Sequence, residues 1–116
     1  MSTGPVVVLT GSTVRAGMEG REAAATRELD AVMREMPGFI SAKDYVADDG
    51  EVLSVFTFAS EDALLRWRDQ PRHLEFQQVT DDYYESFWVQ AAQVYRSYLW
   101  RDGEKKPFPD ARGAAR

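Results

Sequence analysis

The stretch MPGFISAKDYVADDGEVLSVFTF, residues 36–58, decides the fold of this chain. Pro37 lacks a backbone donor and Gly38 adopts positive φ readily, so the pair ends a helix and lets a strand begin. Asp49-Gly50 is a strong hairpin signal, with strand-forming residues on both sides of it. The stretch therefore predicts the end of a helix followed by an antiparallel hairpin.

The segments on either side of this hairpin alternate between strand and helix patterns. Apolar residues recur at helical spacing before Pro37, and Ser60 is a good N-cap for a second helix. Pro71 suits the first position of a third helix, where its missing N–H costs nothing. The expected strands are residues 6–10, 39–46, 52–58 and 87–101, and the expected helices are 18–36, 60–69 and 70–80.

The order strand-helix-strand-strand-helix-helix-strand predicts a ferredoxin-like α+β fold, with helices on one side of a single antiparallel sheet. The chain has 116 residues, enough for one domain, which we place at residues 1–101. Residues 102–116 mix Pro, Gly, Ala and charge, and we expect a disordered tail there.

Bulky apolar residues stand at both parities of the first and last expected strands. A sheet with helices on one side alone would then leave a large apolar patch on its other side. Packing two sheets face to face removes that patch. The pattern predicts a homodimer that forms through the sheet faces, a dimeric α/β barrel.

The composition disfavours several classes of function. Nineteen acidic residues against fourteen basic give a net charge of −5 with no basic run, which argues against nucleic acid or an anionic membrane as partner. The absence of Cys and the lone His73 exclude disulfides, thiolate metal sites and multi-His zinc sites. The apolar run 6–9 is too short for a signal segment or a membrane span, so we expect a cytoplasmic protein.

Three short motifs carry a family resemblance, in the order Pro37-Gly38-Phe39, Asp49-Gly50 and Trp67-Arg68-x-x-Pro71-x-His73. With them, residues 6–96 resemble the antibiotic biosynthesis monooxygenase family of small dimeric α/β barrels. The resemblance implies oxidation of a polycyclic phenol or anthrone to a quinone in secondary metabolism. It also implies that no metal, flavin or haem is needed, because the deprotonated hydroxyaromatic substrate reduces O₂ directly. The implied partners are a small aromatic substrate, O₂ and a second copy of the chain.

Trp67 and His73 are the candidate catalytic residues. Trp67 lies on the inward face of the second expected helix, and the resemblance implies that it lines a pocket between sheet and helices. His73, with an ordinary pKa near 6.5, is the candidate base for a phenolic proton. The plain structural alternatives are core packing for Trp67 and a turn-fixing role for His73. The residues expected to bind substrate are Thr10, Phe76, Gln77 and Tyr84.

Two positions depart from the pattern of haem-degrading relatives. Those proteins have an Asn where this chain has Thr10 and an iron-ligating His where it has Gln77, and the chain contains no Asn. Thr10 or Gln77 would also have to replace the Asn amide that oxygenase members use to orient substrate or oxygen.

The region after the third helix departs as well, because Asp81 and Asp82 stand where family members often have Gly-Arg. Two negative charges there disfavour a polyanionic substrate. Two alternative functions stay open: a haem-binding protein of the same fold with His73 as the iron ligand, and a non-catalytic small-ligand-binding or interaction module.

Overall fold

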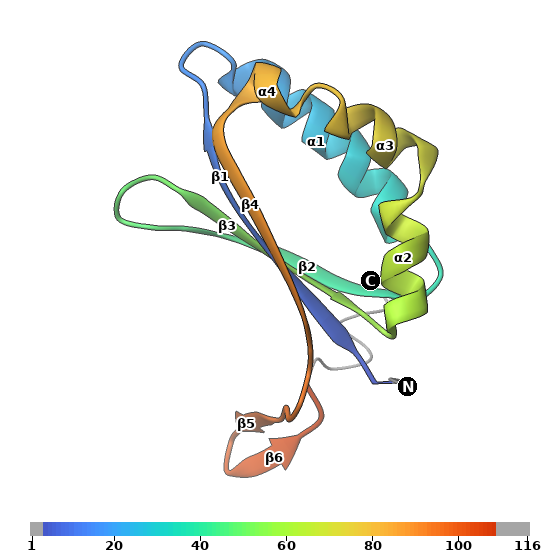
Figure 1. Cartoon of the computed structure of the whole chain (residues 1–116). Coiled ribbons are helices and arrows are strands. Elements are labelled where there is room, and N and C mark those ends of the chain that lie inside the picture. The colour runs from blue at the N-terminus through green and yellow to red at the C-terminus, as the bar shows by residue number, and fades with distance from the viewer. Residues whose placement is uncertain (1–3, 109–116) are drawn as a thin grey trace.

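The computed structural model describes residues 4–108 and confirms the ferredoxin-like α+β fold. Four strands form one antiparallel sheet in the order β2-β3-β1-β4, and a separate two-stranded ribbon follows (Figure 1). The strands are β1 (Val6–Val14), β2 (Phe39–Val46), β3 (Val52–Phe58), β4 (Tyr84–Gln93), β5 (Leu99–Arg101) and β6 (Glu104–Lys106). The helices are α1 (Glu19–Arg34), α2 (Glu61–Arg68), α3 (Pro71–Gln77) and α4 (Thr80–Tyr83).

The turn between α1 and β2 forms as expected. Gly38 has φ of 86°, a left-handed conformation that favours glycine. It also faces α2 closely, since a Cβ at this position would lie 2.4 Å from the Cβ of Ala63. The hairpin β2–β3 keeps its predicted bounds and closes with a bond from Ala47 N–H to the Glu51 carbonyl at 2.8 Å.

Both later helices begin where the sequence places them. The Ser60 hydroxyl accepts a hydrogen bond from Ala63 N–H at 3.1 Å and caps α2. The Gln70 side-chain oxygen accepts one from Arg72 N–H at 2.6 Å, and Pro71 opens α3. The predicted end of the third helix near residue 80 is wrong, because α3 stops at Gln77 and α4 follows as a separate short turn.

The last strand differs most from the expectation of one strand at 87–101. It begins earlier, at Tyr84, and ends at Gln93, after which β5 pairs with β6 through the register Leu99 to Lys106. The start of the expected disordered tail, residues 102–106, is therefore part of this ribbon. Residues 109–116 of that tail lie outside the described residues.

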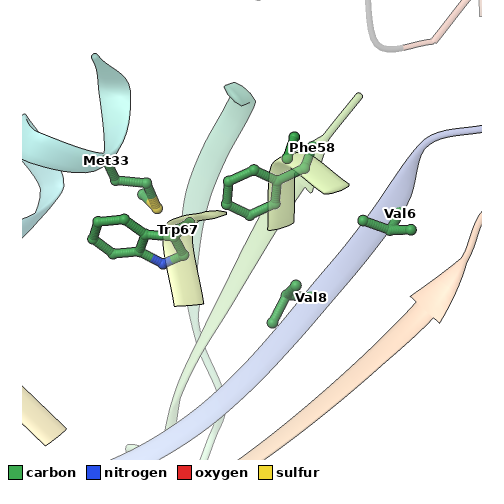
Figure 2. Close-up of a cluster of buried hydrophobic side chains, with 6 residues drawn as sticks. Val6, Val8, Met33, Phe58 and Trp67 are labelled. Carbon is green, nitrogen blue, oxygen red and sulfur yellow. The ribbon is translucent and has the colours of Figure 1, made fainter. Parts of the chain in front are cut away.

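The core lies between one face of the sheet and the helices α1 and α2. Figure 2 shows Met33 and Trp67, from these helices, close to Phe58 of β3 and Val8 of β1. Phe58 is fully buried. Because residues directly opposite in a ladder share a face, Thr10 and its partners Ser54 and Val89 lie on this same side, the helix side.

The opposite side of the sheet carries none of the four helices (Figure 1). Leu9, Val55 and Gln90 share it by register, as do Gly11, Leu53 and Trp88. The Trp88 indole lies over Gly11, where a Cβ would come within 2.0 Å of the indole nitrogen. That nitrogen donates to the Glu51 carboxylate at 2.8 Å, so the indole crosses the face from β4 toward β3.

Candidate active site

His73 and Trp67 are stacked on each other. Their ring centroids are 4.5 Å apart with an interplanar angle of 22°. Trp67 comes from the last turn of α2 and His73 from the first turn of α3, so the short connection through Gln70 sets the pair. Trp67 is only 8% exposed and belongs to the core cluster, whereas His73 is half-buried.

The two nitrogens of His73 have different surroundings. Nδ1 lies 3.1 Å from the backbone carbonyl oxygen of Arg68, and because a carbonyl only accepts, Nδ1 carries the proton and donates. In the neutral ring the lone pair is then on Nε2. Burial lowers the pKa of His73 below 6.5, against the opposing effect of hydrogen bonds to the Arg68 and Trp67 backbone. The ring is therefore neutral at pH 7, with Nε2 able to take a proton.

A second group of rings lies at the other end of α3. Phe76 stacks on Tyr83 at 5.8 Å between centroids and meets Tyr84 edge-on at 6.3 Å. Tyr84 in turn lies 5.2 Å from Phe87 of β4. We call these four residues the aromatic cluster. The cluster joins α3 to the start of β4 and shows apolar ring surface on the helix side of the sheet.

The hydroxyl of Tyr84 is already engaged. It donates to the Glu22 carboxylate of α1 at 2.5 Å, and the side chain is buried. Burial, followed by the bond to Glu22, raises the pKa of Tyr84 far above its ordinary value. Tyr84 therefore stays protonated, and at 5% exposure only a small part of its ring can meet a substrate.

Glu22 was not among the residues predicted to be functional, although its spacing indicates that it lies on the apolar side of α1. Glu22 stands four residues after Met18 and three before Ala25, on the same helical stripe as the apolar residues of α1. A carboxylate on that stripe needs a buried donor. Tyr84 supplies it, which ties α1 to β4.

Two apolar side chains of β4 remain exposed on the helix side. Phe87 is 40% exposed and Val89 is 56% exposed, although both share a face with Thr10 and the core valines of β1. The helices thus leave part of their own side of the sheet uncovered. We call Thr10, Phe87 and Val89, together with the rim residues Phe76 and Tyr84, the helix-side strip.

The predicted site residues fall into two joined pairs and two single positions. Trp67 meets His73, and Phe76 meets Tyr84, with His73 and Phe76 one turn apart on α3. Within residues 4–108, the side chains of Thr10 and Gln77 make no hydrogen bond to either pair, and Gln77 is exposed.

Two surface hollows lie elsewhere on the helices, and neither is lined by Trp67 or His73. One, of about 550 Å³, lies at the α2–α3 junction and is lined by Asp62, Leu65, Arg66, Asp69, Gln70 and Pro71. The other, of about 180 Å³, lies between α1 and α3 and is lined by Ala25, Glu28, Leu29, Arg72, Glu75, Phe76, Val79 and Tyr83. Direct contact between a substrate and Trp67 is limited to the small exposed part of the indole.

The donor set does not fit haem as it is bound by the haem-degrading relatives. Gln77, at the position of their iron ligand, offers an amide on the exposed side of α3. His73, the alternative ligand, keeps Nε2 free, but it is stacked on Trp67 and lines neither of the two hollows described above. Within residues 4–108, no group of three or more His, Cys, Asp or Glu side chains is arranged to hold a metal ion. No helix in the same range is long and apolar enough to cross a membrane.

Comparison with known proteins identifies the family and supports the fold. The family model described as antibiotic biosynthesis monooxygenase matches residues 5–79. No curated protein sequence matches the chain. Among solved structures, Rv0793 from Mycobacterium tuberculosis has a TM-score of 0.73 at 20% identity and covers 81% of this chain and 98% of its own.

Two further structures are similar at comparable coverage. SO0527 from Shewanella oneidensis has a TM-score of 0.71 at 22% identity, covering 80% of this chain and 93% of its own. SnoaB from Streptomyces nogalater, described as a cofactor-independent oxygenase, has a TM-score of 0.69 at 16% identity, covering 81% of this chain and 96% of its own. At these identities the structural likeness establishes the fold.

Proposed function

This chain belongs to the antibiotic biosynthesis monooxygenase family, and on that premise we propose that it oxidises a polycyclic phenol or anthrone to a quinone without a cofactor. SnoaB, a structural neighbour described as a cofactor-independent oxygenase, supports the proposed chemistry. The proposal places the protein in the cytoplasm, as a homodimer built through the sheet faces.

The observation that carries the proposal is the neutral His73, which is held by Trp67 and the Arg68 carbonyl and lies one turn from Phe76 on α3. Its Nδ1–H is fixed on the Arg68 carbonyl, so Nε2 is the nitrogen that removes the substrate proton. Trp67 supports the flat face of the imidazole and limits its rotation. In this reaction Trp67 acts as a positioning residue, and any contact with the substrate ring is made by the exposed part of the indole.

The remaining predicted residues would bind the substrate. A flat polycyclic ring system would lie against Phe76 and Phe87, and would touch Tyr84 only at the small exposed part of its ring. The Thr10 hydroxyl and the Gln77 amide supply hydrogen bonds at the edges of the ring, in place of the missing Asn.

The chemistry balances with O₂ as the sole oxidant. Nε2 takes one proton from the substrate, and the resulting anion gives one electron to O₂. The substrate radical and superoxide then form a carbon–oxygen bond, and the resulting peroxide anion takes the proton back from Nε2. Loss of water from this peroxide leaves the new carbonyl, so one oxygen atom enters the product and the other leaves as water. An apolar surface that excludes bulk water protects the radical pair.

Oxygen uptake by chelator-treated protein on a panel of anthrones and naphthols tests the proposal. We expect uptake with at least one member, quinone formation, and a kcat at least about 100-fold lower in His73→Gln, since general bases contribute rate factors of this size. Leu74→Ala is the matched control, because Leu74 follows His73 on α3 and is exposed. No uptake on the whole panel, or equal turnover by His73→Gln, would contradict the proposal.

A further inference from the structure

The chain leaves the sheet after Gln93 as an arm, residues 94–108, that projects away from the body (Figure 1). Its aromatic side chains face solvent: Tyr95 is 99% exposed, and Tyr98, Trp100 and Phe108 are also exposed. Single exposed aromatics are ordinary, whereas four on one short segment indicate a surface that another molecule covers.

The arm is ordered internally. Strands β5 and β6 pair along their length, and the Ser97 hydroxyl donates to the Phe108 carbonyl at 2.9 Å. The Tyr98 ring is contacted by two cations, Arg96 at 5.6 Å and Lys105 at 4.9 Å. Such preorganisation lowers the entropy that binding would cost.

The arm and the body have opposite charge. Residues 94–108 contain four basic and two acidic side chains, whereas residues 1–93 contain eight basic and sixteen acidic ones. A basic aromatic arm on an acidic body is complementary to the body of another copy.

The most acidic exposed end of the body is the tip of the hairpin β2–β3. Asp44, Asp48 and Asp49 are exposed there, and residues 44–51 contain no basic side chain. The same tip carries apolar surface, since Tyr45 is exposed and Val46 is 72% exposed. The tip therefore offers negative charge, opposite to the charge of the arm, and apolar surface that the aromatic rings of the arm can contact.

The arm of one molecule does not reach the hairpin of the same molecule. In the sheet register, Gln93 lies opposite Val6, whereas Val52 at the hairpin tip lies opposite Ser12. These are opposite ends of β1, about 20 Å apart at the usual rise per strand residue. The arm also runs away from the body beyond Gln93 (Figure 1). Contact between arm and hairpin therefore requires a second copy.

We propose that the arm of one copy docks on the β2–β3 hairpin tip of a second copy, with Lys105 facing Asp48 and Asp49 and with Arg101 and Lys106 adding to the positive charge of the arm. Tyr98 and Trp100, which share the Lys105 face of the ribbon, then cover Tyr45. In a twofold dimer this contact occurs twice. The inference rests on the self-association proposed above and adds a second contact surface to the sheet faces.

Charge reversal with rescue in trans tests the docking. Lys105→Glu/Lys106→Glu alone, and Asp48→Lys/Asp49→Lys alone, should each raise the dimer Kd at least tenfold in sedimentation experiments at low salt. An equimolar mixture of the two variants should restore the wild-type Kd, because every arm then meets a hairpin of opposite charge. Exchanging Arg21 and Glu28 on α1 for Glu and Lys is the control and should leave the Kd unchanged.

A site-directed crosslink supplies a second measurement. The chain has no Cys, so Lys105→Cys and Asp48→Cys introduce the only thiols. A mixture of these two variants should give a covalent heterodimer on oxidation in higher yield than either variant alone. Unchanged Kd values after both reversals, or no preference for the heterodimer, would overturn the proposal.

Two further measurements distinguish docking on a second copy from binding of the arm to a polyanion, and distinguish the docking from the proposed oxidation. Tighter wild-type binding to vesicles with about 30% anionic lipid, or to duplex DNA, than to a second copy would assign the arm to a polyanion and overturn the docking. Oxygen uptake by the same variants is independent, because the helix-side strip contains neither arm nor hairpin residues. Absence of turnover in a protein that passes the rescue test would reject the oxidation alone.

Discussion

His73 combines a structural contact and a free nitrogen in one ring. The stack on Trp67 and the bond from Nδ1 to the Arg68 carbonyl hold the ring, while Nε2 stays unprotonated. The motif Trp67-Arg68-x-x-Pro71-x-His73 singled out both residues as candidates, but it did not show that their rings would meet. It did not show that Trp67 would be so deeply buried, because the sequence does not reveal which side of α2 the core fills completely.

The lowered pKa of His73 makes stability depend on pH in a definite direction. In the unfolded chain His73 titrates near pH 6.5, whereas the folded protein binds that proton only at lower pH. Between the two values the unfolded state holds more protons, so the free energy of unfolding rises as pH increases toward 6.5 and is level above it. Urea denaturation between pH 5 and 8 should show this rise in the wild type.

The variant His73→Gln should lose this part of the pH dependence, since Gln does not titrate. Lys43→Gln is a control that changes one charge on β2, outside the candidate site. A wild type and a His73→Gln variant with the same slope below pH 6.5 would show that burial does not depress the pKa of His73.

At the level of elements, the hairpin β2–β3 could be predicted to the residue, because Gly38 and Gly50 fix both turns. The last strand could not. It ends at Gln93 because its partner β1 begins at Val6, and Val94 N–H makes a final bond to the Pro5 carbonyl. Beyond that point the strand has no neighbour among residues 4–108. No Pro or Gly in residues 87–101 marks the change.

The position of Trp88 of β4, on the helix-free face, depends on Gly11 of β1. Trp88 lies flat on β1 because Gly11 has no side chain, and the indole reaches Glu51 for that reason. Sequence periodicity placed bulky residues at both parities of β4. It did not show that one of them would occupy the space above a glycine.

The substitution Gly11→Ala should displace this indole. The added methyl would lie 2.0 Å from the indole nitrogen, so the ring must move and lose its bond to Glu51. We expect the free energy of unfolding in urea to fall by about 1 to 3 kcal/mol. In the Gly11→Ala/Trp88→Ala double variant the cost should be smaller than the sum of the single costs.

Gly20→Ala in α1 is the matched control for this series, because a Cβ there meets no atom within 4 Å. It should leave stability unchanged or raise it slightly, as Ala favours helices over Gly. Additive effects of Gly11→Ala and Trp88→Ala would mean that the two positions do not compete for the same space.

For the whole molecule, the two faces of the sheet have different roles. The helix side holds the core, the His73–Trp67 pair and the helix-side strip. The other side presents Leu9, Val55 and Trp88 with no helix of this chain over them. The sequence pattern predicted this division from the apolar residues at both parities, and the proposed dimer follows from it.

A charge at the centre of the helix-free face should break the proposed dimer. In Leu9→Glu the carboxylate would be buried without a partner between two sheets, which costs several kcal/mol. We expect the dimer Kd to rise at least about 100-fold in analytical ultracentrifugation, with the far-UV circular dichroism spectrum unchanged. Leu74→Glu on the exposed side of α3 serves as the control. A wild type that is monomeric at micromolar concentration would refute the dimer.

The strand order β2-β3-β1-β4 has a consequence for biosynthesis on the ribosome. β1 lies inside the sheet but is translated before both of its neighbours, β3 and β4. At ordinary elongation rates, β4 emerges about 4 to 15 seconds after β1. During that interval at least one edge of the apolar strand β1 has no partner, so the nascent chain is open to pairing with other chains until β4 arrives.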